Sequence, residues 1–203
     1  MLSQPEQIIS YWLGPEDSDP DIFKKQQKLW YTFKSNTDDD IRERFGETLL
    51  AAESEKLASW HESLDGRLSL VILFDQFSRN LYRGSADAFK NDQRALAISQ
   101  QTINSGAHLT LNIPARVILY HPLHHAERLE CQNSAVSLFE QLLEKCSPEW
   151  HESIQGNLRS IRNHRNVIKR FARFPHRNEI LGRASTPDEI EYLAKDERSY
   201  GQK

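Results

Sequence analysis

The chain has 203 residues, of which 38% are hydrophobic and 27% charged, and its formal net charge is -3 at pH 7. This composition argues against a disordered protein, and a pI near 6.2 argues against a nucleic-acid binder held by phosphate neutralisation. The longest apolar run, residues 68–74, is far too short to cross a bilayer, so we expect no membrane partner.

Neither the start of the chain nor its cysteines indicate export. Residues 1–5 lead directly into an amphipathic pattern, without the basic start and apolar stretch of a signal peptide. Cys131 and Cys146 match no zinc spacing and suit a reducing compartment, so we expect a cytoplasmic protein. No cofactor is expected, because the eight glycines stand as helix stops and form no phosphate-cradling loop or dinucleotide fingerprint.

Apolar residues recur at intervals of three and four along nearly the whole chain, which predicts an all-α fold. In the first half, we expect helices over about residues 5–13, 20–30, 37–52, 68–82 and 85–105. Their limits follow from Gly14 and Gly106 as stops, Ser85 as a cap, Thr37 with Asp40 as a capping box, and Asp65-Gly66 as a turn. The helix over 68–82 begins apolar on all sides, so it should be central.

The second half starts with a helix at Asn112 and Pro114, which we expect to bend or break near His121 and Pro122. A proline disfavours helical geometry in the residue before it and removes one backbone donor. Further helices are expected over about residues 123–145 and 147–171, and a last one after a capping box at 186–189.

We expect one helical domain over residues 1–203. Short helices joined by short turns suit antiparallel pairs, and pairs stacked in series form a solenoid-like superhelix. A compact irregular bundle is the alternative, because the chain shows no clear repeat signature.

Asp75 is the first candidate for a functional residue, because it lies on the expected apolar central helix and should be buried. A buried carboxylate needs a partner. Arg79, four residues on, lies on the same helical face, while Arg83 and Asp92 are within reach of the same place. Two interpretations are open: a structural ion pair between helices, or a group that contacts a ligand.

A second candidate is the segment of His121, His125 and Glu127. The two histidines have the i, i+4 spacing of a metal site, but Pro122 disturbs that geometry and Glu127 points away on a regular helix. We therefore expect no metal ion. His125 is either an acid–base group or an ordinary histidine at the edge of the core.

The third candidate is the arginine-rich stretch over residues 170–183, preceded by His164. Arg173, His176, Arg177 and Arg183 have irregular spacing, which is typical of a loop that wraps charges around something. Guanidinium groups match carboxylate or phosphate oxygens two at a time. Their partners are either acidic residues of the same chain, such as Asp92 and Glu127, or an anionic ligand.

These segments together resemble the bacterial domain-of-unknown-function family 924. The resemblance covers almost the whole chain and is carried by Asp75-Gln76-Phe77, Arg79-Asn80, Arg83-Gly84, Phe89, Asp92, His125, Glu127, Arg170-Phe171, Arg173-Phe174-Pro175-His176-Arg177-Asn178 and Leu181-Gly182-Arg183. It implies a tetratricopeptide-like, alpha-alpha superhelical fold and no established activity. Ser78, Ala126 and Ala172 depart from it, since the family usually has proline, serine and glycine there. His121 and His124 fall outside the family pattern.

Two functional hypotheses follow. In the first, a polar pocket binds a small anionic molecule and carries acid–base hydrolytic chemistry; its catalytic residues are Asp75, His125, Glu127 and His176, and its ligand-binding residues are Arg79, Arg83, Asp92, His164, Arg173, Arg177 and Arg183. In the second, these charges form a structural network, and the superhelix binds a protein or peptide partner.

Overall fold

The computed structural model describes residues 2–31 and 35–195, and within these ranges all regular secondary structure is helical, which confirms the all-α class. The main helices are α1 (Pro5–Leu13), α2 (Pro20–Tyr31), α3 (Ser35–Glu53), α4 (Leu64–Val71), α5 (Ser78–Leu81), α6 (Asp92–Asn104), α7 (Ile113–His125), α8 (Leu129–Lys145), α9 (His151–Phe171) and α10 (Pro187–Lys195). No helix in the described ranges is both long and apolar enough to cross a membrane.

Several helix limits follow the cap signals of the sequence. Gly14 ends α1 with a φ of 82°, and Oδ1 of Asp19 accepts a hydrogen bond from the Ile22 N–H at the start of α2. At α10, Thr186 and Glu189 form the expected capping box: each backbone N–H donates to the other residue's side chain. At these positions, hydrogen bonds between residues close in sequence are sufficient to set where the helix begins or ends.

Two expected helix starts in the first half are wrong. Thr37 lies inside α3, which already begins at Ser35. Asp65-Gly66 is not a turn, because α4 begins at Leu64 and Oγ of Ser63 caps it by accepting from the Gly66 N–H at 3.0 Å. A Cβ at Gly66 would lie 2.2 Å from the carbonyl oxygen of Trp60, so this glycine allows two backbone segments to touch.

The expected limits between residues 85 and 129 also need correction. Ser85 caps only the short helix η3 (Ala86–Phe89), and α6 starts later, at Asp92. Helix α7 continues through Pro122 to His125, because residues 117–124 are all buried and their packing offsets the one backbone hydrogen bond that the proline removes. The chain leaves helical geometry at Ala126 instead, and α8 begins at Leu129.

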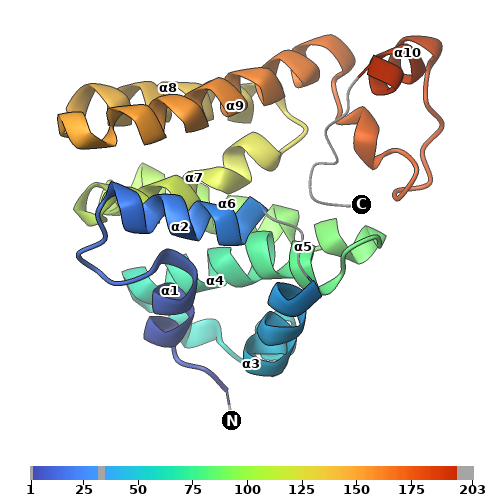
Figure 1. Cartoon of the computed structure of the whole chain (residues 1–203). Coiled ribbons are helices and arrows are strands. Elements are labelled where there is room, and N and C mark those ends of the chain that lie inside the picture. Colours follow the sequence, from blue (N-terminus) through green and yellow to red (C-terminus); the bar gives the residue numbers. More distant parts are fainter. Residues whose placement is uncertain (1, 32–34, 196–203) are drawn as a thin grey trace.

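A single continuous helical stretch passes through the centre of the molecule. It consists of α4, the π-helical segment η2 (Ile72–Phe77) and α5, and every residue from 68 to 78 is buried. Figure 1 shows α8 and α9 antiparallel along one side, with α7 beside them and α6 and α4 following inward. A large hydrophobic core joins these helices to α1 and α3, and a smaller apolar cluster around Phe174 joins the end of α9 to α10.

Ala172, which follows α9, adopts the left-handed conformation with φ 58° and ψ 3°. This is the position at which the family resembled by the sequence usually has glycine. An L-residue in this conformation brings its Cβ close to its own carbonyl oxygen, whereas glycine has no such contact. The departure from the family pattern therefore places a modest strain at the start of the C-terminal segment.

We expect Ala172→Gly to raise the free energy of unfolding by about 0.5–1 kcal/mol, because it removes the strain of the left-handed backbone. Denaturant unfolding followed by circular dichroism measures the change. Ala97→Gly is the matched control: Ala97 is exposed within α6, and glycine there should lower the free energy of unfolding by about 1 kcal/mol. A loss of stability in both variants would contradict the assignment of strain to Ala172.

Candidate functional site

Asp75 is positioned by the π-helical segment of the central helix. Such segments are rare, insert an extra residue into the turn and occur frequently at functional sites. The Asp75 side chain is completely buried. Its carboxylate accepts a short hydrogen bond from Nε2 of Gln76, and Oδ1 lies 3.2 Å from Nη1 of Arg79. The expected partner one turn along the helix is thus in place.

His125 provides a further partner for Asp75 from the last turn of α7. Its Nδ1 lies 2.7 Å from Oδ1 and 3.0 Å from Oδ2 of the carboxylate. Burial, and after it the positive charge of Arg79, lower the pKa of His125 well below 6.5, so the imidazole is neutral at pH 7. A neutral ring that donates through Nδ1 keeps Nε2 as its basic nitrogen, and the side chain remains 18% exposed.

Arg79 also binds Asp92, the first residue of α6. Nη1 of Arg79 lies 3.0 Å from Oδ1 of Asp92, and Nη2 donates to Oδ2 at 3.1 Å. Burial raises the pKa of Asp92, although the nearby guanidinium groups act in the opposite direction. Burial would lower the pKa of Arg79, but Asp75 and Asp92 outweigh it and raise that pKa. Arg79 therefore carries a compensated charge between two carboxylates.

Arg177 is held mainly by aromatic rings. Its Cζ lies 4.6 Å from the ring centroids of both Phe89 and Phe174, while Nη1 is 3.5 Å from Oδ2 of Asp92. The side chain is 8% exposed, and Nε has no hydrogen-bond partner among the residues described. Burial lowers the pKa of Arg177 to about 10, which leaves it charged at pH 7. The rings fix the guanidinium group, but its charge is only weakly compensated.

We call Asp75, Arg79, Asp92, His125 and Arg177 the central cluster. These residues come from four separate parts of the chain: the central helix, α6, α7 and the short helix η6 (Pro175–Arg177). All five are candidate residues of the sequence analysis, and the structure brings them into mutual contact. With His125 neutral, two carboxylates balance two guanidinium groups, so the cluster has no excess charge.

A row of histidine rings runs from the buried His121, beside the central cluster, through His124 to the half-buried His164. The ring centroids lie 4.8 Å apart for His121 and His124, and 5.1 Å apart for His124 and His164. Gln76 connects the row to the cluster, because its Nε2 lies 3.2 Å from Nδ1 of His121. Burial lowers the pKa of His121 to about 4 and that of His124 well below 6.5, so both rings are neutral at pH 7.

His121 and His124 were not among the expected site residues, although three histidines between residues 121 and 125 are a usable signal. Because a bend or break was expected near Pro122, the three histidines were not expected to lie together in the last turns of one helix, as they do in α7. Within the described part of the chain, no group of histidine, cysteine, aspartate and glutamate side chains is arranged to hold a metal ion.

Glu127 is engaged in a structural contact next to the central cluster. Nη1 and Nη2 of Arg183 donate to its two oxygens at 2.7 and 3.0 Å, and the Phe174 N–H donates to Oε1 at 2.7 Å. Burial alone would raise the pKa of Glu127, but these hydrogen bonds lower it. Glu127 and Arg183 therefore join the α7–α8 connection to the C-terminal loop, and this pair lies outside the central cluster.

Arg173 and Arg83 bind carboxylates outside the central cluster. Nε and Nη2 of Arg173 donate to both oxygens of the buried Glu189 at 2.6 and 2.7 Å, and these hydrogen bonds lead the effects that lower the pKa of Glu189 to about 2. Nε and Nη2 of Arg83 donate to Asp38 of α3 at 2.8 and 2.9 Å. The expectation that both arginines point into a shared site is therefore wrong. Asp38 is a partner that the sequence analysis missed.

His164 and His176 both contact the ring of Phe174. Their ring centroids are 5.5 and 5.4 Å from the ring centroid of Phe174. Nδ1 of His164 also lies 3.0 Å from the carbonyl oxygen of Ser160, one turn earlier on α9. The two candidate histidines thus contact the same ring that supports Arg177.

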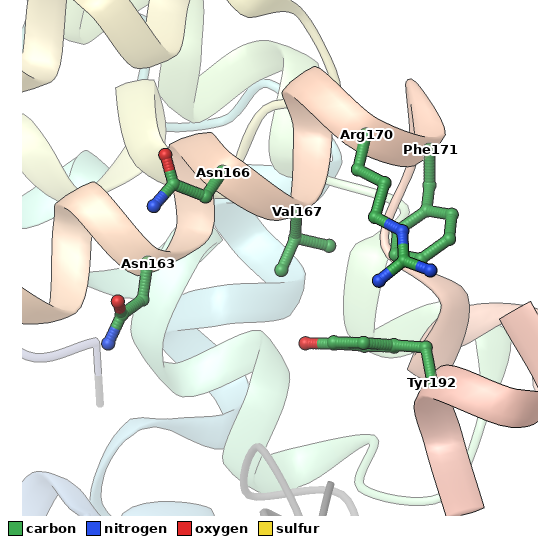
Figure 2. A pocket seen from close by; sticks show the side chains of 6 residues that line it. All are labelled: Asn163, Asn166, Val167, Arg170, Phe171 and Tyr192. Carbon is green, nitrogen blue, oxygen red and sulfur yellow. The ribbon is translucent and has the colours of Figure 1, made fainter. Parts of the chain in front are cut away.

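Two cavities of the protein lie away from the central cluster. One, of about 320 Å³, is lined by Asn163, Asn166, Val167, Arg170, Phe171 and Tyr192, and Figure 2 shows Arg170 over the Phe171 ring, extending toward Tyr192. The other, of about 500 Å³, lies between α1, α4 and the start of α7. No residue of the central cluster lines either cavity. The central cluster itself is closely packed, and its His125 side chain is more exposed than that of Arg177, at 18% against 8%.

We expect the protein to lose stability as the pH falls from about 6.5 to about 4. In this range unfolded histidine binds protons and the folded His121, with a pKa of about 4, does not, so protonation favours the unfolded chain. His121→Gln should reduce this pH dependence in denaturant unfolding. His61→Gln, which changes an exposed histidine of η1 (Ala58–Glu62), should keep the wild-type pH dependence. An unchanged pH dependence in His121→Gln would contradict the assignment.

Comparison with known proteins identifies the family but no activity. A solved structure of a protein of unknown function from Agrobacterium tumefaciens, ATU0120, is 30% identical in sequence and superposes with a TM-score of 0.78, covering 95% of this chain and 97% of that chain. No curated protein matches the chain. The family model described as bacterial protein of unknown function (DUF924) matches residues 8–197. The chain therefore belongs to the DUF924 family.

Proposed function

We propose that the central cluster binds a small anionic ligand and that His125 transfers a proton at this site. The observation that carries the proposal is the pairing of a neutral histidine, held by the buried Asp75, with a weakly compensated guanidinium group, that of Arg177. A basic nitrogen and a fixed cation in one cluster supply the two elements of acid–base chemistry on an anion.

The burial of Asp75 supports a functional role. An ionised carboxylate in the interior costs several kcal/mol unless it is paired, and an apolar residue would pack in the central helix without that cost. Here the carboxylate is kept within a π-helical segment and directed at a histidine. Desolvated groups with specific charge partners are concentrated at functional sites.

The roles of the residues follow from their contacts. The two phenylalanine rings orient Arg177 for the anion, and Asp92 competes only weakly for it across 3.5 Å. Nε2 of His125 takes a proton from water, whose oxygen attacks the acyl or phosphoryl centre of the ligand. The imidazolium ion, stabilised by Asp75, then returns the proton to the leaving group. The proposed reaction class is therefore hydrolysis.

A second candidate function is binding of a protein or peptide by a tetratricopeptide-like superhelix. Its support is that α6 packs against α7, α7 against α8, and α8 against α9, as in stacked antiparallel pairs. The first half departs from this order, since α1 packs on α4 and α3 on α5. The exact balance of charges in the central cluster is also compatible with a purely structural network. We favour the first function because the contact of Arg177 with Asp92 is long, at 3.5 Å, and Asp92 binds Arg79 more closely, at 3.0 Å.

A thermal-shift screen with phosphorylated and carboxylated metabolites tests the proposed site. We expect a ligand at about a hundredfold excess over its Kd to stabilise the protein by about 2.7 kcal/mol, or roughly 5–10 °C for a chain of this size. Arg177→Met should abolish the shift, since methionine fills the space between the rings without the charge. Arg170→Met is the matched control: it removes an exposed, ring-stacked arginine outside the cluster and should keep the shift.

Two results would overturn the anion site. A full shift in Arg177→Met would place the ligand elsewhere, and loss of the shift in Arg170→Met alone would place it in the cavity of Figure 2. If none of the anions stabilises the wild type and the protein instead captures a peptide with micromolar affinity, the second function is favoured.

His125→Asn separates binding from chemistry. Asparagine preserves a donor toward Asp75 but has no basic nitrogen in place of Nε2, so we expect the ligand-induced shift to persist. Turnover of a hydrolysable ligand should fall by about 100-fold or more. Steady-state hydrolysis assays beside the thermal-shift measurement check this. Unchanged turnover would exclude His125 as the group that moves the proton.

A further inference from the structure

The cavity of about 500 Å³ between α1, α4 and the start of α7 has an apolar floor. Leu13, Leu68 and Ala115 form this floor and are buried, at 3%, 1% and 4% exposed. Leu64 and Leu111 add half-buried apolar surface. The volume lies within the range of about 300–1,000 Å³ that is usual for small-molecule sites. The cavity is therefore large enough, and sufficiently dry at its base, for a ligand with an apolar body.

The charges around this cavity all have one sign. Glu6, Glu16 and Asp65 line it, and no lysine, arginine or histidine does. None of these carboxylates forms an ion pair within the described ranges. Glu6 and Asp65 stand in the first turns of α1 and α4, where the helix dipole favours a negative charge. Glu16 lies outside any helix and has no such explanation.

The segment that carries Glu16 is fixed in place before any ligand binds. Nδ2 of Asn112 donates to the Glu16 carbonyl oxygen at 3.0 Å, while Oδ1 of the same side chain caps α7 by accepting from the Ala115 N–H. Oγ of Ser18 donates to the carbonyl oxygens of Leu13 and Pro15. One side chain thus joins the turn after α1 to α7, so the cavity is preformed and a ligand would not have to order it.

We propose that this cavity binds a small organic cation, an ammonium or guanidinium group on a short alkyl or aryl body. The apolar floor takes the body, and Glu16, with Glu6 and Asp65, holds the cationic group at the rim. This site shares no residue with the central cluster, and the inference does not rest on the proposed function.

Isothermal titration calorimetry with hexylammonium, hexanol and hexanoate tests the charge and the apolar body separately. All three probes carry the same alkyl chain, so they differ only in the head group. We expect saturable binding of hexylammonium that Ser10→Phe abolishes, weaker binding of hexanol, and no binding of hexanoate that depends on Ser10 or Glu16. Added salt should weaken the binding of hexylammonium, because part of the affinity is Coulombic.

Two variants locate the site, with a control in the adjacent residue. Glu16→Gln should weaken hexylammonium binding by about three- to tenfold, the effect of one partly exposed carboxylate. Asp17→Asn removes the neighbouring exposed charge, which does not line the cavity, and should leave the affinity unchanged. Ser10→Phe, on the exposed side of α1, should fill the cavity and abolish binding.

Three results would overturn the proposal. These are no saturable binding of hexylammonium at millimolar concentration, equal affinity for the ammonium and carboxylate probes, and equal effects of Glu16→Gln and Asp17→Asn. Circular dichroism of each variant shows whether it has folded. The variants that locate this site, Glu16→Gln and Ser10→Phe, change no residue of the central cluster, so failure here leaves the anion proposal for that cluster unaffected.

Discussion

The burial of one carboxylate, Asp75, is the constraint on which the rest of the central region depends. The interior offers no water to solvate an ionised group, so the chain must supply partners from several directions. Arg79 and Gln76 approach from the same helix and His125 from α7. The π-helical segment provides the local geometry for these contacts. Packing of α7 against the central helix is therefore linked to the protonation state of a histidine.

The charged residues near the C-terminal loop fall into two groups, according to how closely an opposite charge neutralises each of them. Glu127 with Arg183, and Glu189 with Arg173, use both carboxylate oxygens in short contacts and hold the C-terminal loop against the helices. Arg177 differs, because two phenyl rings hold it and its carboxylate contact is long. Saturated pairs have little capacity left for a ligand. Unequal compensation, more than the number of charges, distinguishes the candidate site from structural ion pairs.

The sequence was most informative where a residue acts on its own neighbours. Gly14 as a helix stop, the capping box of Thr186 and Glu189, and the pairing of Asp75 with Arg79 all depend on spacing of at most four residues. The sequence was misleading where contacts with distant parts of the chain determine the local conformation. Gly66 lies inside α4 and not in a turn: its lack of a side chain gives space to the Trp60 backbone. Helix α7 passes Pro122 because packing around it outweighs one lost hydrogen bond.

The sequence by itself determined the all-helical class and the residues from which a site could be built. It also indicated the family, which the comparisons confirm. Only the tertiary structure decided which arginine pairs with which carboxylate. Arg83 pairs with Asp38 and Arg173 with Glu189, whereas Arg177 contacts two phenylalanine rings. The physical reason is that helix periodicity fixes contacts within a turn or two. Ion pairs between helices depend on how the helices pack, which no local spacing contains.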